Sequence, residues 1–101
     1  MKEPNVIYGK TYEQARKEKL VGDLIISEFE GTSEWNSFRT PKLSLAQKID
    51  QAIEDCKSQI LTEAEREGAN WIFMHSIRYV VGGASDAAGP VWINAQLGKT
   101  R

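Results

Sequence analysis

The sequence predicts an α+β protein of two layers, in which one long helix covers one face of a mainly antiparallel sheet of three to four strands. Three observations support this fold class. Apolar residues recur at helical spacing from Leu45 to Glu67, a strand-like segment follows at once, and an alternating segment lies near the end of the chain. The expected order is therefore β-α-β-β, with a weaker element at the N-terminus.

Length and composition limit the classes of protein that fit. The 101 residues have room for one domain, with residues 1–20 as an N-terminal extension and residues 21–101 as the β-α-β-β core. A net charge of -1 provides no overall attraction to nucleic acid or to an anionic membrane. A single cysteine excludes an internal disulfide framework. No apolar leader and no run near the ~20 residues of a transmembrane helix is present, so we expect a cytoplasmic protein.

The N-terminal segment carries a weak pattern. Residues 6–8, Val-Ile-Tyr, predict a brief edge strand that Gly9 ends. Thr11 and Gln14 have the spacing of a capping box, which predicts a short surface helix over residues 15–20. The alternative is a poorly ordered lead-in to the next strand.

The first main strand is expected over residues 21–30, because its β-branched residues favour a pleated surface, and Gly31 is expected to end it. Residues 31–43 then predict an irregular segment that is longer than most loops in compact domains. It carries two aromatic residues, Trp35 and Phe38. Exposed, they would contact a ligand or a neighbouring subunit; otherwise they fold back over the edge of the core.

The long helix has clear end signals. Ser44 and Gln47 form a second capping box, and Gly68 is placed to adopt the left-handed conformation that ends a helix. At 1.5 Å per residue the helix spans ~35 Å, so we expect part of it to pack outside its own sheet. One apolar stripe is expected to face the core: Leu45, Ile49, Ala52, Ile53, Cys56, Ile60 and Ala64.

Two chemically versatile residues are interpreted as structural. Cys56 falls inside the apolar stripe, where a free cysteine behaves as a small hydrophobic residue. His75 is the single histidine, whereas a metal site needs three or four ligands at suitable geometry. We therefore predict no metal site, and His75 is only a weak candidate for a metal ligand. We expect the His75 side chain to lie in the core or in an interface.

The strand after the helix is expected over residues 69–81, with its odd-numbered residues facing the helix: Trp71, Phe73, His75, Ile77, Tyr79 and Val81. A glycine-rich loop over residues 82–90 leads to another strand, whereas a phosphate-binding loop must lead into a helix N-terminus. Residues 91–97 alternate in the manner of a half-covered antiparallel strand, which places Trp92 on the outer face.

These elements predict a topology and a partner. A helical crossover makes the first two main strands parallel, and the last strand fits between them, antiparallel to both. The sheet face opposite the helix would be bare and would carry apolar residues such as Trp92. We therefore expect a homo-oligomer that covers this face.

The junction between the helix and its strand resembles a known family. Residues 63–79, with Gly-Ala-Asn at 68–70, and residues 94–100, Asn-Ala-Gln-Leu-Gly-Lys-Thr, are similar to the YbjQ-like proteins, which are described as possibly metal-binding. The strand–helix–strand–strand order also resembles the dodecins, small flavin-binding proteins. That resemblance implies a flavin-stacking role for Trp71, and Gln96 lies on the strand that carries the dodecins' flavin-contacting glutamine. The segment from residue 35 to 42 and the longer helix depart from the dodecin pattern.

The function that these observations favour is a non-enzymatic homo-oligomer with a small-ligand or metal-binding role, in which Trp71, Trp92 and Gln96 are the candidate ligand contacts. One alternative is a protein-interaction module that uses the segment from Trp35 to Phe38. Another is flavin binding of the dodecin type. An enzyme is least favoured, because no paired acid–base arrangement is visible in the sequence, and the identity of any cofactor stays open.

Overall fold

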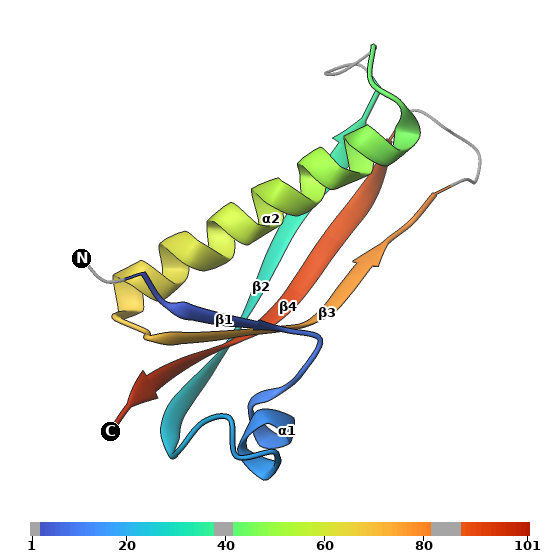
Figure 1. The fold of residues 1–101 in the computed structure, drawn as a ribbon. Coiled ribbons are helices and arrows are strands. Elements are labelled where there is room, and N and C mark those ends of the chain that lie inside the picture. Colours follow the sequence, from blue (N-terminus) through green and yellow to red (C-terminus); the bar gives the residue numbers. More distant parts are fainter. Residues whose placement is uncertain (1–2, 38–41, 82–87) are drawn as a thin grey trace.

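The computed structural model describes residues 3–37, 42–81 and 88–101. These residues form a four-stranded sheet that one long helix crosses on one face (Figure 1). The elements are β1 (Asn5–Tyr8), α1 (Tyr12–Lys17), β2 (Leu24–Asn36), α2 (Leu45–Glu67), β3 (Trp71–Tyr79) and β4 (Ala88–Thr100). The strand order is β1-β3-β4-β2.

The pairing of the three long strands confirms the predicted topology. β4 lies between β2 and β3 and is antiparallel to both, while β1 is parallel to β3. Thus the crossover helix connects two parallel strands, and the last strand fills the space between them. The sheet is mixed, with antiparallel pairing along most of its length.

Helix α2 begins and ends where its capping residues predict. Ser44 accepts a hydrogen bond from the Gln47 backbone N–H, and the Gln47 side chain returns one to the Ser44 N–H. At the other end Gly68 has φ 70° and ψ 30°, and the N–H of Ala69 donates to the carbonyl of Ala64 at 2.8 Å. This pattern is a Schellman motif, in which glycine carries the left-handed turn without a Cβ penalty.

The apolar stripe of α2 packs on β2 and β4. Its buried members are Ile49, Ala52, Cys56, Ile60 and Ala64. Leu45 was expected in this stripe but is 43% exposed. Three of the five buried residues are small, and they allow the helix backbone to approach the sheet closely.

The predicted end of the first main strand at Gly31 is wrong, because β2 continues through Gly31 to Asn36. Gly31 serves the approach of α2: a Cβ at this position would lie 2.6 Å from the backbone oxygen of Cys56. Trp35 therefore belongs to a strand and is 1% exposed, which contradicts its expected place on an irregular segment but agrees with its folding onto the core. Phe38 lies outside the described residues.

The expected faces of β3 are reversed in its first half. Ile72 and Met74 pack in the core beneath α2, whereas Phe73 packs in a second cluster on the opposite face. The odd-numbered residues Trp71 and Phe73 therefore point away from the long helix.

A bulge changes this alternation halfway along the strand. Met74 pairs with Ala95 and Ser76 pairs with Asn94, so His75 is an extra residue in the ladder. Beyond it, Ile77 pairs with the core residue Ile93 and therefore lies on the α2 side. The expectation that side chains alternate between the two faces without interruption along this strand was wrong.

The N-terminal elements cover part of the opposite face. β1 confirms the predicted edge strand, and the capping box of Thr11 and Gln14 is also present. The helix itself spans Tyr12–Lys17 rather than residues 15–20, and it buries Ala15 against Leu24 and Phe73. The face opposite α2 is therefore not bare at this end of the sheet.

Candidate functional site

The three tryptophans, which the sequence marks as the main candidate contacts, lie in three separate environments. Trp35 is buried beside α2, Trp92 lies on the sheet face opposite α2, and Trp71 borders a groove at the start of β3. Each environment has a different chemical character.

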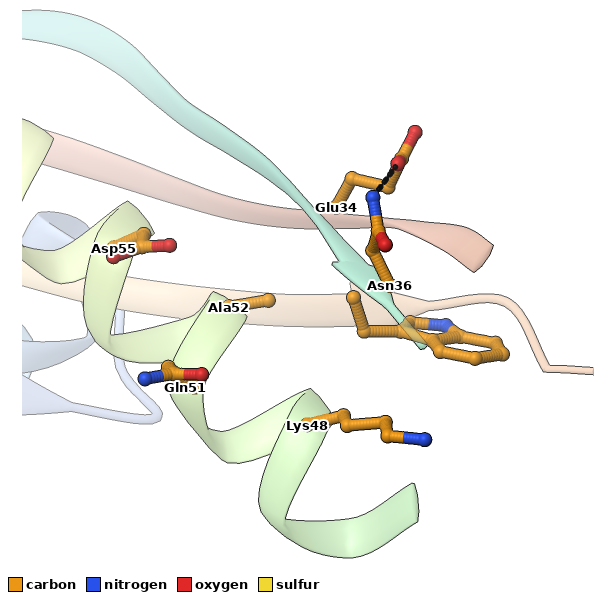
Figure 2. A pocket seen from close by; sticks show the side chains of 7 residues that line it. Glu34, Asn36, Lys48, Gln51, Ala52 and Asp55 are labelled. Carbon is orange, nitrogen blue, oxygen red and sulfur yellow. Dashed lines mark hydrogen bonds between the residues drawn. The ribbon is translucent and has the colours of Figure 1, made fainter. Parts of the chain in front are cut away.

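The first environment is a polar hollow of about 260 Å³ where the end of β2 meets the first turns of α2. Figure 2 shows its polar side chains, with Glu34 and Asn36 from β2 and Lys48, Gln51 and Asp55 from α2. The Trp35 indole N–H donates to the carbonyl of Val80 at 2.9 Å. The indole therefore links the ends of β2 and β3.

Several polar groups around this hollow already have protein partners. The Lys48 ammonium donates to the Ser37 hydroxyl at 3.0 Å, and the Asn36 amide donates to Glu34 at 3.1 Å. The Ser33 hydroxyl donates to the Asp55 carboxylate at 3.3 Å. The bond from Ser33 connects β2 to α2, and the bond from Lys48 connects α2 to the residue that follows β2.

The second environment is the sheet face around Trp92. The Arg78 guanidinium lies over the indole, 5.5 Å from the ring centroid, which is cation–π geometry. Glu30 pairs with Asn94, and Thr32 pairs with Trp92, so this face is mostly polar. The expectation of an apolar bare face is therefore wrong for this part of the sheet, apart from Trp92 itself. Other apolar residues of the same face, such as Leu24 and Phe73, lie at the end that α1 covers.

Two buried polar atoms near the bulge have no hydrogen-bond partner among the described residues: Nε2 of His75 and Oδ1 of Asn94. Among residues 3–37, 42–81 and 88–101, no three histidine, cysteine, aspartate or glutamate side chains gather closely enough to hold a metal ion. His75 thus stands at an irregular point of β3 without companion ligands in the described residues.

Gln96 attaches α1 to the sheet. Its Oε1 accepts the backbone N–H of Tyr12 at 2.7 Å, and its Nε2 donates to the Glu28 carboxylate at 3.0 Å. Its amide is therefore engaged at both ends. The structure does not bring Trp71, Trp92 and Gln96 together in one cavity, although all three lie on the face opposite α2.

The third environment is a groove of about 850 Å³ bordered by β1, the last turns of α2 and the start of β3. Its apolar lining includes Val6, Leu61, Ala69 and Trp71. A volume of this size is within the ~300–1,000 Å³ of pockets that hold small organic ligands.

Trp71 is one of the residues that line this groove, and its side chain lies on the sheet face opposite α2. Its ring stacks on Phe73 with an interplanar angle of 12° and a centroid distance of 6.2 Å. Gly98 lies opposite Trp71 in β4, and a Cβ there would approach Trp71 Cβ to 3.3 Å and Leu24 Cδ1 to 2.9 Å. The missing side chain at Gly98 therefore leaves room for the indole.

Asn70 holds the walls of the groove together. Its backbone carbonyl accepts the N–H of Asn5 at 2.9 Å, and its N–H donates to the carbonyl of Gly98 at 2.9 Å. Its side-chain oxygen accepts the N–H of Thr100, also at 2.9 Å. Asn70 thus joins β1, β3 and β4 at one point, a role that the pattern of the sequence did not reveal.

The groove carries acidic groups. Glu3 and Glu65 are among its lining residues, whereas the described lining contains no lysine or arginine. Lys99 is close by, because its Cε would lie 3.6 Å from a Cβ at Gly68. Even with this lysine, the local balance of charge is negative.

Cys56 is buried in the core and takes no part in any of the three environments. Burial raises the pKa of its thiol above the ordinary value of 9.0, and the neighbouring Asp55 carboxylate adds to this shift. The thiol is therefore protonated at neutral pH and is a poor nucleophile. This agrees with the structural interpretation of the residue.

No protein-family model matches the chain, and neither a curated protein nor a solved structure matches it. Within the described ranges, no helix has both the length and the apolar character needed to cross a membrane.

Proposed function

We propose that the protein is a small-molecule-binding protein with a non-catalytic role, and that its ligand occupies the groove beside Trp71. The observation that carries the proposal is the half-buried Trp71 among the lining residues of an 850 Å³ groove. One side of the indole is packed on Phe73, which fixes the ring before a ligand arrives. A preorganised aromatic surface of this kind favours a planar ligand that stacks on it.

The remaining lining favours the same class of ligand. Val6 and Leu61 supply apolar contact, and Leu61 is 42% exposed, so a ligand would cover it. The carboxylates of Glu3 and Glu65 favour hydrogen-bond donors or a positive charge on the ligand and disfavour an anion. We therefore propose a planar aromatic ligand that is neutral or cationic.

Flavin binding of the dodecin type is the narrower form of this proposal. It rests on the position of Trp71 and on the β-α-β-β order, together with the resemblance to the dodecins. The Gln96 amide would need another role than ligand contact, because Tyr12 and Glu28 engage it. The protein-interaction alternative loses its main residue, since the buried Trp35 offers no surface to a partner.

The test uses three planar probes that differ in charge: riboflavin, which is neutral, its anionic phosphate FMN, and the cation proflavine. Each is titrated into isotope-labelled protein while the indole N–H signals are followed by NMR. Binding in the groove shifts the Trp71 signal and leaves the Trp35 signal in place, because the Trp35 N–H is bonded to Val80. Riboflavin and proflavine are expected to bind more tightly than FMN.

The variant Trp71→Ala should lose this binding, and Trp92→Ala is the matched control because Trp92 lies away from the groove. If no probe shifts the Trp71 signal, the planar-ligand proposal is wrong. If binding survives in Trp71→Ala and is lost in Trp92→Ala, the ligand site belongs to the opposite half of the sheet instead.

A further inference from the structure

The outer edge of β3 is only half covered. β1 pairs with β3 from Trp71 to Met74, and Gly9 adds one hydrogen bond to the Met74 carbonyl. Beyond this point no strand among the described residues lies on that side of β3, and Figure 1 shows its far half at the border of the sheet. Residues 75–79 therefore form an open strand edge.

The direction of the backbone groups along this edge follows from one hydrogen bond. The N–H of Val80 donates to the carbonyl of Pro90 in β4 at 3.2 Å. Because backbone groups alternate in direction along a strand, those of Arg78 also turn toward β4. The N–H and C=O groups of Ile77 and Tyr79 consequently point outward, where an added strand would meet them.

Apolar side chains accompany these outward backbone groups. Ile77 is 44% exposed, Tyr79 52%, Val80 49% and Val81 46%. The cause is the position of α2, which packs mainly on β2 and β4 and leaves the far half of β3 uncovered. An open edge with exposed apolar residues is a template for pairing with another strand.

The opposite edge of the sheet is protected in a way that the β3 edge is not. The Gln59 amide of α2 donates to the carbonyl of Thr32 at 2.6 Å and accepts the Thr32 N–H at 3.0 Å. This side chain occupies the outward backbone groups in the middle of β2. For residues 77–81, no such cover is present in the described part of the chain.

We propose that the open edge of β3 pairs with the same edge of a second copy of the chain, antiparallel and about a two-fold axis at Tyr79. Ile77 then lies opposite Val81 of the second copy, and the two Tyr79 side chains lie side by side. The product is one continuous sheet across the dimer. The proposal is independent of the ligand groove, which lies at the other end of β3.

Two neighbouring registers fit less well. An axis at Arg78 would place two arginines directly opposite each other at close range, which is unfavourable. An axis at Ile77 would bring Val81 of the second copy opposite Phe73, where β1 already occupies the edge. The axis at Tyr79 avoids both conflicts and pairs apolar residues on the α2 side of the sheet.

Sedimentation equilibrium of the full chain tests the assembly. The wild type is expected to dimerise, and Ile77→Lys is expected to weaken dimerisation by about tenfold or more, since it places a charge in two symmetric apolar pairs. Leu45→Lys is the matched control, because Leu45 is 43% exposed but lies on α2. A wild-type protein that stays monomeric over a wide range of concentration overturns the proposal, and so does a dimer that Ile77→Lys leaves intact.

A cysteine cross-link tests the register. Tyr79→Cys should form an intermolecular disulfide under mild oxidation, since directly opposed residues lie ~5.5 Å apart between Cα atoms. Ile77→Cys should not, because its two copies would be separated by four residues along the strands, or about 14 Å. The native Cys56 does not interfere, because it is 0% exposed. Cross-linking of Ile77→Cys without Tyr79→Cys would overturn the assigned axis.

Discussion

Gly31→Ala tests the contact between α2 and the sheet. A Cβ at Gly31 would lie 2.6 Å from the backbone oxygen of Cys56, whereas ordinary contact begins at 3.4 Å. The obstacle is the backbone of a 23-residue helix, which cannot rotate away as a side chain does. The helix must therefore move by about 0.8 Å, or β2 must bend, and either change disturbs the packing of the whole apolar stripe.

The expected cost follows from two opposing effects. Overpacking of a core costs about 1–3 kcal/mol. Replacing glycine by alanine restricts the unfolded chain, which returns about 0.4–1 kcal/mol. We expect the free energy of unfolding to fall by about 1–2 kcal/mol, which lowers the melting temperature by roughly 5–15 °C for a domain of this size.

Urea and thermal unfolding, followed by circular dichroism, measure this effect. Gly22→Ala is the matched control, because nothing lies within 4 Å of a Cβ at Gly22, so the same substitution should leave stability unchanged or raise it slightly. If Gly31→Ala is as stable as Gly22→Ala, the close approach of α2 to β2 is not a constraint on the fold and the reasoning fails.

Three further changes probe other parts of the fold. Lys19 has φ 61° at the end of α1, so Lys19→Gly should raise the free energy of unfolding by about 0.5–1 kcal/mol in urea titrations, and an unchanged or lower value would contradict this. Trp35→Phe should lower it by about 2 kcal/mol, because the Val80 carbonyl loses its donor and a cavity forms; Trp92→Phe, measured alongside, should cost less. The raised pKa of Cys56 means that the folded state holds the thiol proton more tightly than the unfolded state. This stabilisation is therefore present below the ordinary pKa of 9.0 and is lost as the pH rises through the folded-state pKa. Cys56→Ala should show a weaker loss of stability at alkaline pH than the wild type, and equal pH profiles would argue against a buried thiol.

The candidate site was predictable only in part. Trp71 could be named before the structure was known, because of its place directly after the helix and its resemblance to a flavin-stacking residue. The other walls of the groove come from distant segments, with Val6 on β1 and Leu61 on α2. No local pattern links these residues, since their proximity depends on β1 pairing in parallel with β3.

The open edge of β3 was also hidden in the sequence. Residues 77–81 look like the continuation of a core strand, and their exposure results from two tertiary facts. β1 is short and ends opposite Met74, and α2 packs on the neighbouring strands. Our sequence-based expectation placed the interface on the sheet face, whereas α1 covers one end of that face and polar residues occupy much of the rest.

The sequence by itself determined the elements whose signals are local. The capping box at Ser44 and the left-handed Gly68 set the ends of α2, and the alternation of residues 91–97 set the faces of β4. Caps and periodicity depend on neighbours within about four residues, so a single chain segment displays them.

Only the tertiary structure decided which way β3 faces and where β2 ends. The bulge at His75 reverses the alternation of β3, because it adds to β3 one residue that has no partner in β4. Glycine is typical of a turn, but Gly31 lies in a strand, because α2 approaches so closely that a side chain would not fit there. Both outcomes depend on backbone contacts between segments far apart in the chain, and such contacts leave no periodic trace in the sequence.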